Sequence, residues 1–217
     1  MKALGKTKTV QKYVNQQRII RLISRNDVSN RVNLAQSLNL TTAAVTKLVS
    51  PLISSGLVSE VKATNSSAGR KPMILNLVPD KCTILSVRIE RRRFALAAYD
   101  FCGKEMKLVN NFFEKSMSPD QVMNSIINGL LEMKATYPNT IAVGIAVPGP
   151  FSKEKERVML MSGFPGWENI EIRSRIQEAT GLYSFIDQDA NCGAFAELWY
   201  EKEDIDNLIF VVAERGV

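Results

Sequence analysis

The chain has 217 residues, of which 45% are apolar and 23% charged, a composition typical of a water-soluble globular protein that can form more than one hydrophobic core. It contains no histidine and only three widely spaced cysteines, which excludes histidine-based acid/base chemistry and gives no sign of a zinc site or a disulfide framework. No apolar run is long enough to span a membrane, and the N-terminus lacks the apolar segment of a signal peptide. We therefore expect a cytoplasmic protein with no membrane partner, no bound metal and no cofactor.

The positive charge is concentrated in the first 81 residues. Residues 1–81 contain 13 lysines and arginines against 3 acidic residues, whereas residues 82–217 contain 15 against 19, so the net charges are +10 and −4. A basic segment of this size is typical of nucleic-acid binding, because neutralisation of phosphates supplies most of the non-specific affinity. The asymmetry predicts two domains: residues 1–81, which bind nucleic acid, and residues 82–217, which have a separate sensing or catalytic role.

The basic domain begins with three predicted helices. Apolar residues at helical spacing place the first helix over residues 15–26 and the second over residues 31–38. A turn follows in which Asn39 can adopt a left-handed conformation, and Thr41 can cap a third helix that ends near Gly56. A short helix, a three-residue turn and a longer helix form a helix-turn-helix, whose last helix enters the major groove of DNA.

Two short strands complete this domain. Residues 57–62 and 73–78 are predicted to be strands, and the polar segment "ATNSSAGRKP" between them forms the loop of a hairpin, which makes the fold a winged helix-turn-helix. Arg70 and Lys71 in that loop can contact phosphates or the minor groove. The full set of predicted DNA contacts is Arg31, Thr41, Thr42, Ala43, Thr46, Lys47, Arg70 and Lys71. The alternative is a small helical bundle whose polar faces are only solvated.

Three segments of this domain, taken together, resemble a known family. The runs "VNQQRIIRLI", "NRVNLAQSLNLTTAAVTKLVSPLISSGLVSE" and "GRKPMILNL" are similar to the N-terminal winged helix of sugar-responsive repressors in the ROK family (repressors, open reading frames and kinases). The resemblance implies a transcriptional repressor of sugar metabolism that binds double-stranded operator DNA. A homodimer or higher homo-oligomer is expected, because a dimer places two recognition helices in successive major grooves.

Residues 82–217 alternate between predicted strands and helices. Strands are expected over residues 83–90, 93–100, 104–113, 140–148, 182–187 and 207–213, and helices over 118–136, 168–181 and 190–200. The first of these helices is expected to start at a Ser118 cap and to bury Val122, Ile126, Ile127, Leu130 and Leu131. Three strands followed by helix–strand repeats predict an α/β fold of the ribonuclease-H-like or actin-like kind.

The ROK resemblance continues through this second domain. The runs "VGIAVPGPFS", "FPGWENIEIRSRIQEATGLYSFIDQDANCGAFAE" and "LIFVVAERGV" are similar to consecutive segments of the first half of a ROK domain, whose fold is that of actin-like sugar kinases. The resemblance implies that the zinc site of the family, and its histidine and glutamate sugar ligands, would lie beyond Val217. The sequence is therefore expected to be a truncated ROK protein.

Two departures from the family pattern argue against kinase activity. Kinases of this class hold ATP phosphates with glycine-containing hairpins, because only glycine lets backbone N–H groups approach phosphate oxygens closely. The first such place has "VRIERRR" over residues 87–93, and the second has "AERGV", in which Glu214 would repel phosphate. We expect no enzyme activity and no catalytic residue. The alternative is an ATP-dependent sugar kinase with an appended winged helix.

The resemblance also indicates an effector site. It places Asp189 at the position of the kinase base, where repressors can hydrogen-bond a bound sugar. Gln188 replaces the usual asparagine, and Gly163 replaces the sugar-contacting asparagine ahead of "PGW". With Gly149 of the "VPGP" turn, these residues form the expected site for a sugar or protein effector. Two alternatives stay open: Asp189 only caps the following helix, or the domain is a protein-interaction module with no small-molecule ligand.

Overall fold

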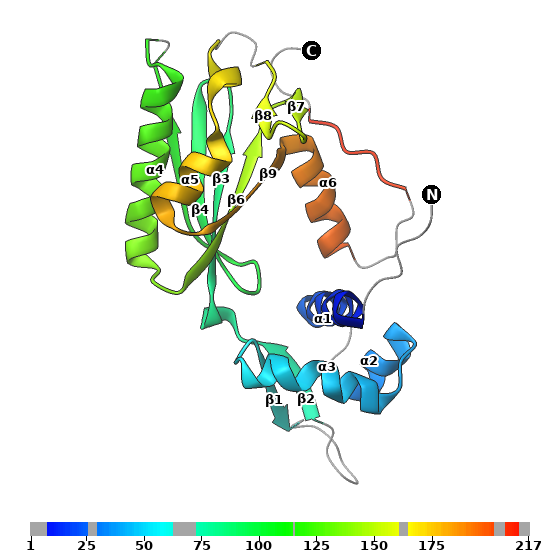
Figure 1. Cartoon of the computed structure of the whole chain (residues 1–217). Helices are drawn as coiled ribbons and strands as arrows, with labels where there is room; N and C mark the ends of the chain where they lie inside the picture. Colours follow the sequence, from blue (N-terminus) through cyan, green and yellow to red (C-terminus); the bar gives the residue numbers. More distant parts are fainter. Residues whose placement is uncertain are drawn as a thin grey trace. The chain divides into compact units, whose positions relative to one another are not determined.

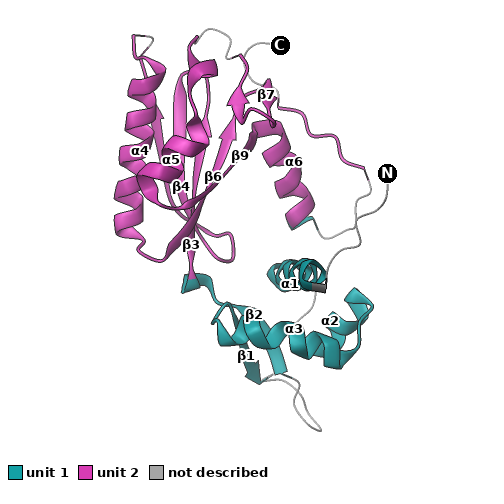
Figure 2. Ribbon diagram, viewed as in Figure 1, with its two compact units in different colours: residues 1–81, 200–203 teal, residues 82–199, 204–217 magenta. Residues whose placement is uncertain are grey.

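The computed structural model describes residues 8–25, 30–62, 73–114, 116–160, 165–201 and 207–212 (Figure 1). Two compact units make up the chain: unit 1 is residues 1–81 with 200–203, and unit 2 is residues 82–199 with 204–217 (Figure 2). Each unit is organised around buried apolar side chains of its own. Among the described residues, no helix is both long and apolar enough to cross a lipid bilayer.

The described part of unit 1 contains three helices and a two-stranded hairpin. The helices are α1 (Lys8–Ser24), α2 (Arg31–Leu38) and α3 (Thr42–Ser54), and the antiparallel strands are β1 (Val58–Lys62) and β2 (Met73–Leu77), followed by the 3₁₀ turn η1 (Pro79–Lys81). This order of elements is that of a winged helix-turn-helix, as predicted. The first helix begins at Lys8, earlier than the apolar spacing alone indicated.

Three side chains define the turn between α2 and α3. Oδ1 of Asn30 accepts hydrogen bonds from two backbone N–H groups in the first turn of α2, each at 3.0 Å. Asn39 has the predicted left-handed conformation, with φ of 54°, and ends α2. Oγ1 of Thr41 accepts a hydrogen bond from the N–H of Ala44 at 3.2 Å and so caps α3, as predicted. Local chemistry therefore sets both ends of the turn.

A shared core fixes α3 in place. The helices and the hairpin together bury Ile19, Leu34, Val45, Val49 and Leu75. Removing each such side chain from water stabilises the fold by about 1.5–3 kcal/mol. The side-chain amide of Gln16 on α1 donates to the carbonyl of Leu48 at 3.1 Å, which fastens α1 directly to α3. The orientation of α3 therefore depends on its packing against the other helices and the hairpin of unit 1.

The described residues of unit 2 form a five-stranded mixed sheet. Its strands are β3 (Thr83–Ile89), β4 (Arg93–Asp100), β5 (Glu105–Phe112), β6 (Thr140–Val147) and β9 (Tyr183–Gln188), in the spatial order β5-β4-β3-β6-β9. The strands β3, β4 and β5 are antiparallel to one another, whereas β6 and β9 continue the sheet parallel to β3. A separate small hairpin pairs β7 (Phe151–Ser152) with β8 (Arg157–Val158). The predicted α/β class is confirmed.

Helices cover one face of this sheet. The helices α4 (Pro119–Thr136) and α5 (Ile172–Thr180) lie side by side there, and α6 (Asp189–Tyr200) follows β9 (Figure 1). The predicted cap of α4 is confirmed as a capping box: Oγ of Ser118 accepts from the N–H of Gln121, and Oε1 of Gln121 accepts from the N–H of Ser118. The core between helices and sheet includes Leu85, Val87, Ile126, Val143 and Trp167.

One predicted core residue of α4 is in fact exposed. Val122, Ile126 and Leu130 are fully buried, whereas Leu131 is 40% exposed. An α-helix turns about 100° per residue, so Leu131 lies beyond the edge of the stripe that these three residues form. The sequence prediction widened the apolar face by one residue too many.

Two elements in the second half of unit 2 differ from the prediction: one is shorter and the other does not form over the described residues. The helix α5 begins only at Ile172, because Ile170 is extended and separates it from the 3₁₀ turn η2 (Trp167–Asn169). Residues 207–212 form no strand, although the apolar run over residues 207–213 predicted one. Among the described residues no strand pairs with the outer edge of β9, which is the last strand of the sheet.

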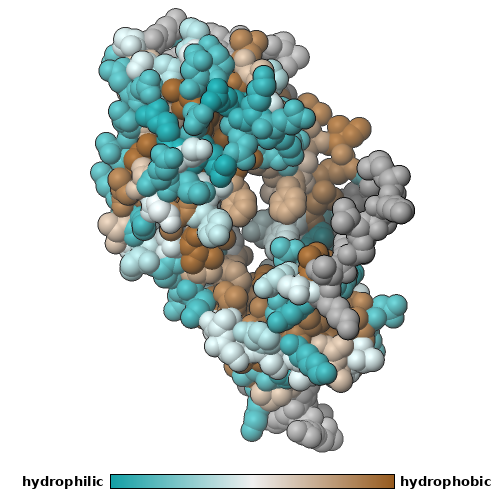
Figure 3. All heavy atoms as spheres, in the orientation of Figure 1, coloured by the Kyte–Doolittle hydropathy of each residue, from teal (hydrophilic) through white to brown (hydrophobic). Residues whose placement is uncertain are grey.

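The face of unit 2 in view in Figure 3 is mostly hydrophilic over α4 and α5. Ion pairs join neighbouring elements nearby, among them Arg175 with Asp120 and Arg173 with Glu156. Such partly exposed pairs contribute only about 0–1 kcal/mol each. This face is an ordinary solvated surface.

Candidate nucleic-acid interface and effector site

The outward face of α3 presents small and polar side chains. Its exposed residues are Thr42, Ala43, Thr46, Lys47 and Ser50, preceded by the exposed cap Thr41. Val45 and Val49 on the opposite side are fully buried, so the core fixes which face of the helix is outward. The predicted reading residues of α3 therefore share one face, and all are small or flexible enough to enter a major groove.

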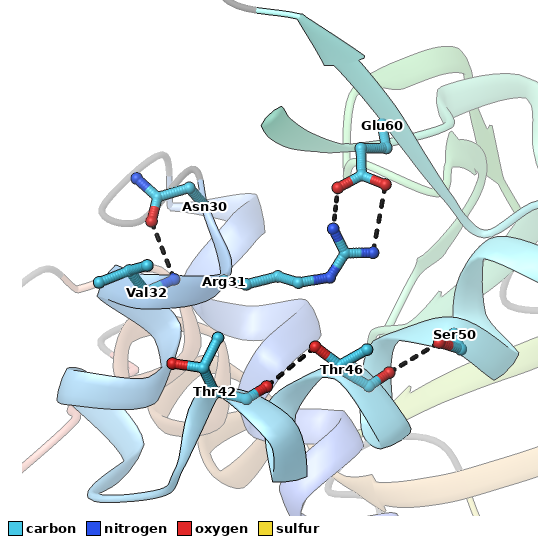
Figure 4. A network of polar contacts seen from close by, with 7 residues as sticks. All are labelled: Asn30, Arg31, Val32, Thr42, Thr46, Ser50 and Glu60. Atoms are coloured by element: carbon cyan, nitrogen blue, oxygen red, sulfur yellow. Dashed lines mark hydrogen bonds and ion pairs between the residues drawn. The ribbon is translucent and has the colours of Figure 1, made fainter. Parts of the chain in front are cut away.

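The hydroxyl groups on this face donate back into their own helix. Oγ1 of Thr46 donates to the carbonyl of Thr42 at 2.9 Å, and Oγ of Ser50 donates to the carbonyl of Thr46 at 2.8 Å (Figure 4). With the proton engaged, the lone pairs of each hydroxyl oxygen are left to accept hydrogen bonds from outside. In a major groove the matching donors are the amino groups of adenine and cytosine.

Arg31 is paired inside the protein. Its two terminal guanidinium nitrogens contact the two carboxylate oxygens of Glu60 on β1, with Nη2 3.1 Å from Oε2 (Figure 4). A phosphate at this position would have to compete with that carboxylate. Sequence reasoning missed Glu60, because nothing local in the sequence connects it with a residue 29 positions earlier.

The hairpin that follows α3 is described only for its strands. The pairing runs from Val58 opposite Leu77 to Lys62 opposite Met73. Residues 63–72, which include Arg70 and Lys71, lie outside the described residues. The DNA contacts predicted for these two side chains stay predictions.

In unit 2, two of the predicted effector residues touch each other. The strands β6 and β9 are parallel neighbours, so their carboxyl ends meet at one edge of the sheet, where ligands bind in folds of this class. Gly149 follows β6 and Gln188 ends β9, and a Cβ at position 149 would lie only 2.2 Å from Nε2 of Gln188. The glycine therefore leaves room for the amide group of the flexible Gln188 side chain. Gly163 lies outside the described residues.

Asp189 is the first residue of α6 and is half-buried. Its Oδ1 accepts a hydrogen bond from the N–H of Ala190 at 2.8 Å, whereas a capping aspartate bonds to an N–H two or three residues further on. Its charge is still favourable at the positive end of the helix. Burial, with the charges of Asp187 and Asp189, raises the pKa of the Cys192 thiol, and the charge of Lys153 offsets part of this rise. Among the described residues, no three potential ligands gather closely enough to hold a metal ion.

The carboxylate of Asp187 is contacted by two side chains and one backbone N–H group. Nζ of Lys153 is 2.8 Å from its Oδ2, and the side-chain amide of Asn191 donates to Oδ1 at 2.9 Å. Partial burial would raise the pKa of Asp187, but hydrogen bonds from Asn191, Lys153 and the N–H of Gln188, with the charge of Lys153, lower it overall. Sequence reasoning missed Lys153, whose only signal was a charged turn of a kind that is common on surfaces.

Replacing Lys153 with methionine is expected to raise the pKa of Asp187, because a hydrogen bond and a positive charge that favour the carboxylate are removed. A carboxyl pKa lowered in the folded state adds stability above the unfolded pKa, and this contribution is lost as pH falls through the folded pKa. The variant should therefore lose less stability on acidification. An NMR titration of the carboxyl groups measures the pKa, with Lys155→Met in the same turn as control. An unchanged pKa would contradict the ion pair.

Gly149→Ala is expected to destabilise unit 2 by no more than about 1 kcal/mol, below the usual effect of overpacking, because the colliding group is the end of a flexible side chain that can move. The added Cβ would collide with the amide of Gln188. The double variant Gly149→Ala/Gln188→Ala should recover most of the loss, because the colliding group is gone. Urea denaturation measures both. Additive losses in the double variant would show that the collision is not the cause.

The turn between β3 and β4 occupies the place where the family resemblance puts the first phosphate loop. The N–H of Glu90 donates to the carbonyl of Arg93 at 2.9 Å and closes the turn. The carboxylate of Glu90 accepts from Nη2 of Arg93 at 3.0 Å and lies 3.3 Å from Nε of Arg88. An acidic group neutralised by arginines thus fills the turn. The second expected loop, residues 213–217, lies outside the described residues.

A helix-turn-helix with a hairpin, followed in the same chain by a mixed sheet of order β5-β4-β3-β6-β9, defines a winged-helix protein with a second, ribonuclease-H-like unit. The model of the ROK family matches residues 85–217, which is more than half of the chain. The chain therefore belongs to the ROK family.

Curated relatives match nearly the whole chain. The xylose repressor of Caldicellulosiruptor bescii is 25% identical over an alignment of 216 residues, with coverage of 96% of this chain and 53% of that protein. The xylose repressor of Bacillus subtilis is 28% identical over 221 residues, with coverage of 96% and 55%. The DNA-binding transcriptional dual regulator NagC of Escherichia coli is 23% identical, with coverage of 94% and 51%. The chain thus spans about half the length of the curated relatives it matches.

A solved structure agrees with the fold. The crystal structure of a ROK family transcriptional regulator, a homologue of the E. coli Mlc protein, superposes with a TM-score of 0.72 at 24% identity. The match covers 91% of this chain and 51% of that one. At this identity the likeness shows the fold of the chain. The ligand has to be inferred from the site residues, because one fold can bind different ligands.

Proposed function

We propose that this chain is a DNA-binding transcriptional regulator of sugar metabolism, with a repressor role. The observation that carries the proposal is the exposed polar face of α3, presented by a helix-turn-helix in a segment of net charge +10. In this proposal α3 lies in the major groove, where Thr42, Thr46 and Lys47 meet base edges and Thr41 and Ala43 lie beside them. Arg70 and Lys71 reach the minor groove or the phosphates. The repressor names of the relatives support the same role.

The second part of the proposal concerns regulation. The edge of the sheet in unit 2 where β6 and β9 end, with Gly149, Gln188 and Asp189, binds an effector, and Gly163 belongs to the same site. The relatives named as xylose repressors favour a sugar as the effector class. In a homodimer, the effector would shift the spacing of the two winged helices and so change the affinity for an operator.

Titration of double-stranded DNA tests the first part. The chain is used to select duplexes from a random-sequence pool, and its affinity for the selected duplex is measured between about 50 and 200 mM salt. We expect affinity to fall steeply with salt and to exceed that for an unselected duplex by at least about 1,000-fold. Affinity that is independent of salt, or equal for both duplexes, would sink the proposal.

Calorimetry against a panel of pentoses, hexoses and N-acetylated hexosamines tests the second part. We expect one sugar class to bind to the parent chain and about 10–100-fold more weakly to Asp189→Asn, because a charged acceptor for a sugar hydroxyl is lost. Ser184→Ala, a change in the same strand β9 but in a buried position, is the control for general damage. If no sugar binds while DNA binding persists, the sugar proposal is wrong and the alternative of a protein effector is the one to test.

Phosphoryl transfer is the competing function, because Asp189 stands at the position of a kinase base. The turn at Glu90 argues against it, since this turn has no glycine to let backbone N–H groups approach ATP phosphates, and the N–H of Glu90 already donates to the carbonyl of Arg93. We expect no sugar-dependent ATP turnover. Turnover that disappears in Asp189→Asn would restore the kinase interpretation.

A further inference from the structure

Arg31 and Glu60 join the helix-turn-helix of unit 1 to its hairpin. Arg31 is the first residue of α2 and Glu60 is the middle residue of β1, and their side chains point toward one another (Figure 4). The side chains are only 24% and 19% exposed. A two-point contact between a guanidinium and a carboxylate fixes orientation as well as distance. The pair therefore constrains how β1 lies against α2.

Glu60 occupies the inner face of the hairpin. Side chains alternate along a strand, so Glu60 shares its face with Val58, and the partners of these two residues across the hairpin, Leu75 and Leu77, are buried. A carboxylate beside apolar side chains is strongly disfavoured unless a cation accompanies it. Arg31 supplies that cation. Loss of either residue would therefore leave the charge of the other one mostly buried and unpaired.

Arg31 in turn depends on Glu60. The N-terminus of a helix has a partial positive charge, which disfavours a cation there, and α2 has no acidic residue in its first turn. Glu60 brings the compensating charge from another element. Nε of Arg31 is buried and has no hydrogen-bond partner among the described residues. Nε of the guanidinium is thus buried in the protein, and its two terminal nitrogens contact the carboxylate of Glu60.

We propose that Arg31 acts in DNA binding as a positioning residue: through Glu60 it holds the hairpin β1–β2 at the angle to α2 that lets the hairpin and α3 engage one duplex. The inference rests on the proposed DNA-binding function and refines it. Arg31 does not contact phosphate, and Glu60 promotes DNA binding although it is one of only three acidic residues in residues 1–81.

The sign of the effect of Glu60→Gln tests the proposal. A positioning role predicts that Glu60→Gln binds the selected duplex about tenfold more weakly, although a negative charge near DNA has been removed. A phosphate-contact role predicts the opposite, because Arg31 is freed: binding tightens, and the salt slope of log affinity steepens by about one. Asp80→Asn, which removes another acidic residue of unit 1, is the matched control and should not weaken binding. Tighter binding by Glu60→Gln overturns the proposal.

An exchange of the two residues separates pairing from charge. Arg31→Glu alone places two carboxylates together and should weaken binding more than Glu60→Gln does. Adding Glu60→Arg restores both the net charge and the pair, so affinity should return to within about threefold of the parent chain. A folded exchange variant that stays as weak as Arg31→Glu overturns the proposal.

Folding is checked by circular dichroism and urea denaturation of every variant. If Glu60→Gln does not fold, Arg31→Lys decides, because lysine keeps the charge but cannot form the two-point contact. Weaker binding by folded Arg31→Lys supports positioning, and parent affinity overturns it. Failure of the proposed function is distinct: the parent chain itself would then bind no duplex, or bind without salt dependence.

Discussion

The double variant Lys47→Ala/Arg70→Ala is expected to bind the selected duplex about 100-fold more weakly than the parent chain, with a salt slope lower by about two. Lys47 is exposed on the outward face of α3, and Arg70 lies in the segment that joins the two strands of the hairpin. Each side chain that neutralises a phosphate releases counterions, so each loss reduces the slope by about 0.9. Fluorescence anisotropy of a labelled duplex over a series of salt concentrations measures both quantities.

The matched control removes the same charge from the other unit. Lys104 and Lys107 are exposed, at and beside the edge strand β5 of unit 2. Lys104→Ala/Lys107→Ala should leave the slope within about 0.5 of the parent value, because charges far from phosphates are screened. Equal losses in the two double variants would mean that net charge alone governs binding, and that unit 1 does not form the interface.

Ile126→Ala is expected to lower the free energy of unfolding of unit 2 by about 2–5 kcal/mol, whereas Leu131→Ala on the same helix should cost less than about 1 kcal/mol. Ile126 is fully buried between α4 and the sheet, so its loss leaves a cavity, but Leu131 is 40% exposed. The two substitutions remove apolar groups of the same size, so any difference between their effects on stability comes from the difference in burial.

Tryptophan fluorescence during urea denaturation measures this difference. The chain has two tryptophans, of which Trp167 is fully buried in the core that contains Ile126. Replacing Trp199 with phenylalanine in all variants makes Trp167 the only reporter. Equal losses for the two variants would show that the apolar face of α4 is as wide as the sequence pattern indicated, and that the core is arranged differently.

Elements defined by local chemistry were predictable. The turn between α2 and α3 depends on Asn39 and Thr41, whose conformations and hydrogen bonds involve neighbours within a few residues. The capping box at Ser118 is local in the same way. The mixed sheet followed from apolar runs of strand length, because such runs are stable only when paired and covered.

Features that depend on residues distant in sequence were not predictable. Arg31 was predicted to meet phosphate, and only the fold brings Glu60 to its guanidinium. Lys153 reaches Asp187 because the hairpin β7–β8 lies beside the end of β9, and no pattern linked these residues. The strand predicted over residues 207–213 is the converse error: the apolar pattern was present, but residues 207–212 do not pair with the sheet, because a pattern in the sequence does not by itself set backbone pairing.

The sequence by itself determined the basic and acidic halves, the order of elements in the winged helix, the α/β class and the ROK resemblance. These follow from composition, periodicity and caps, which act over a few residues at a time. The tertiary structure alone decided which charged groups distant in sequence are paired: Arg31 with Glu60 and Asp187 with Lys153. A charge is available to a ligand only where the fold has not already paired it, because electrostatic attraction depends on distance in space.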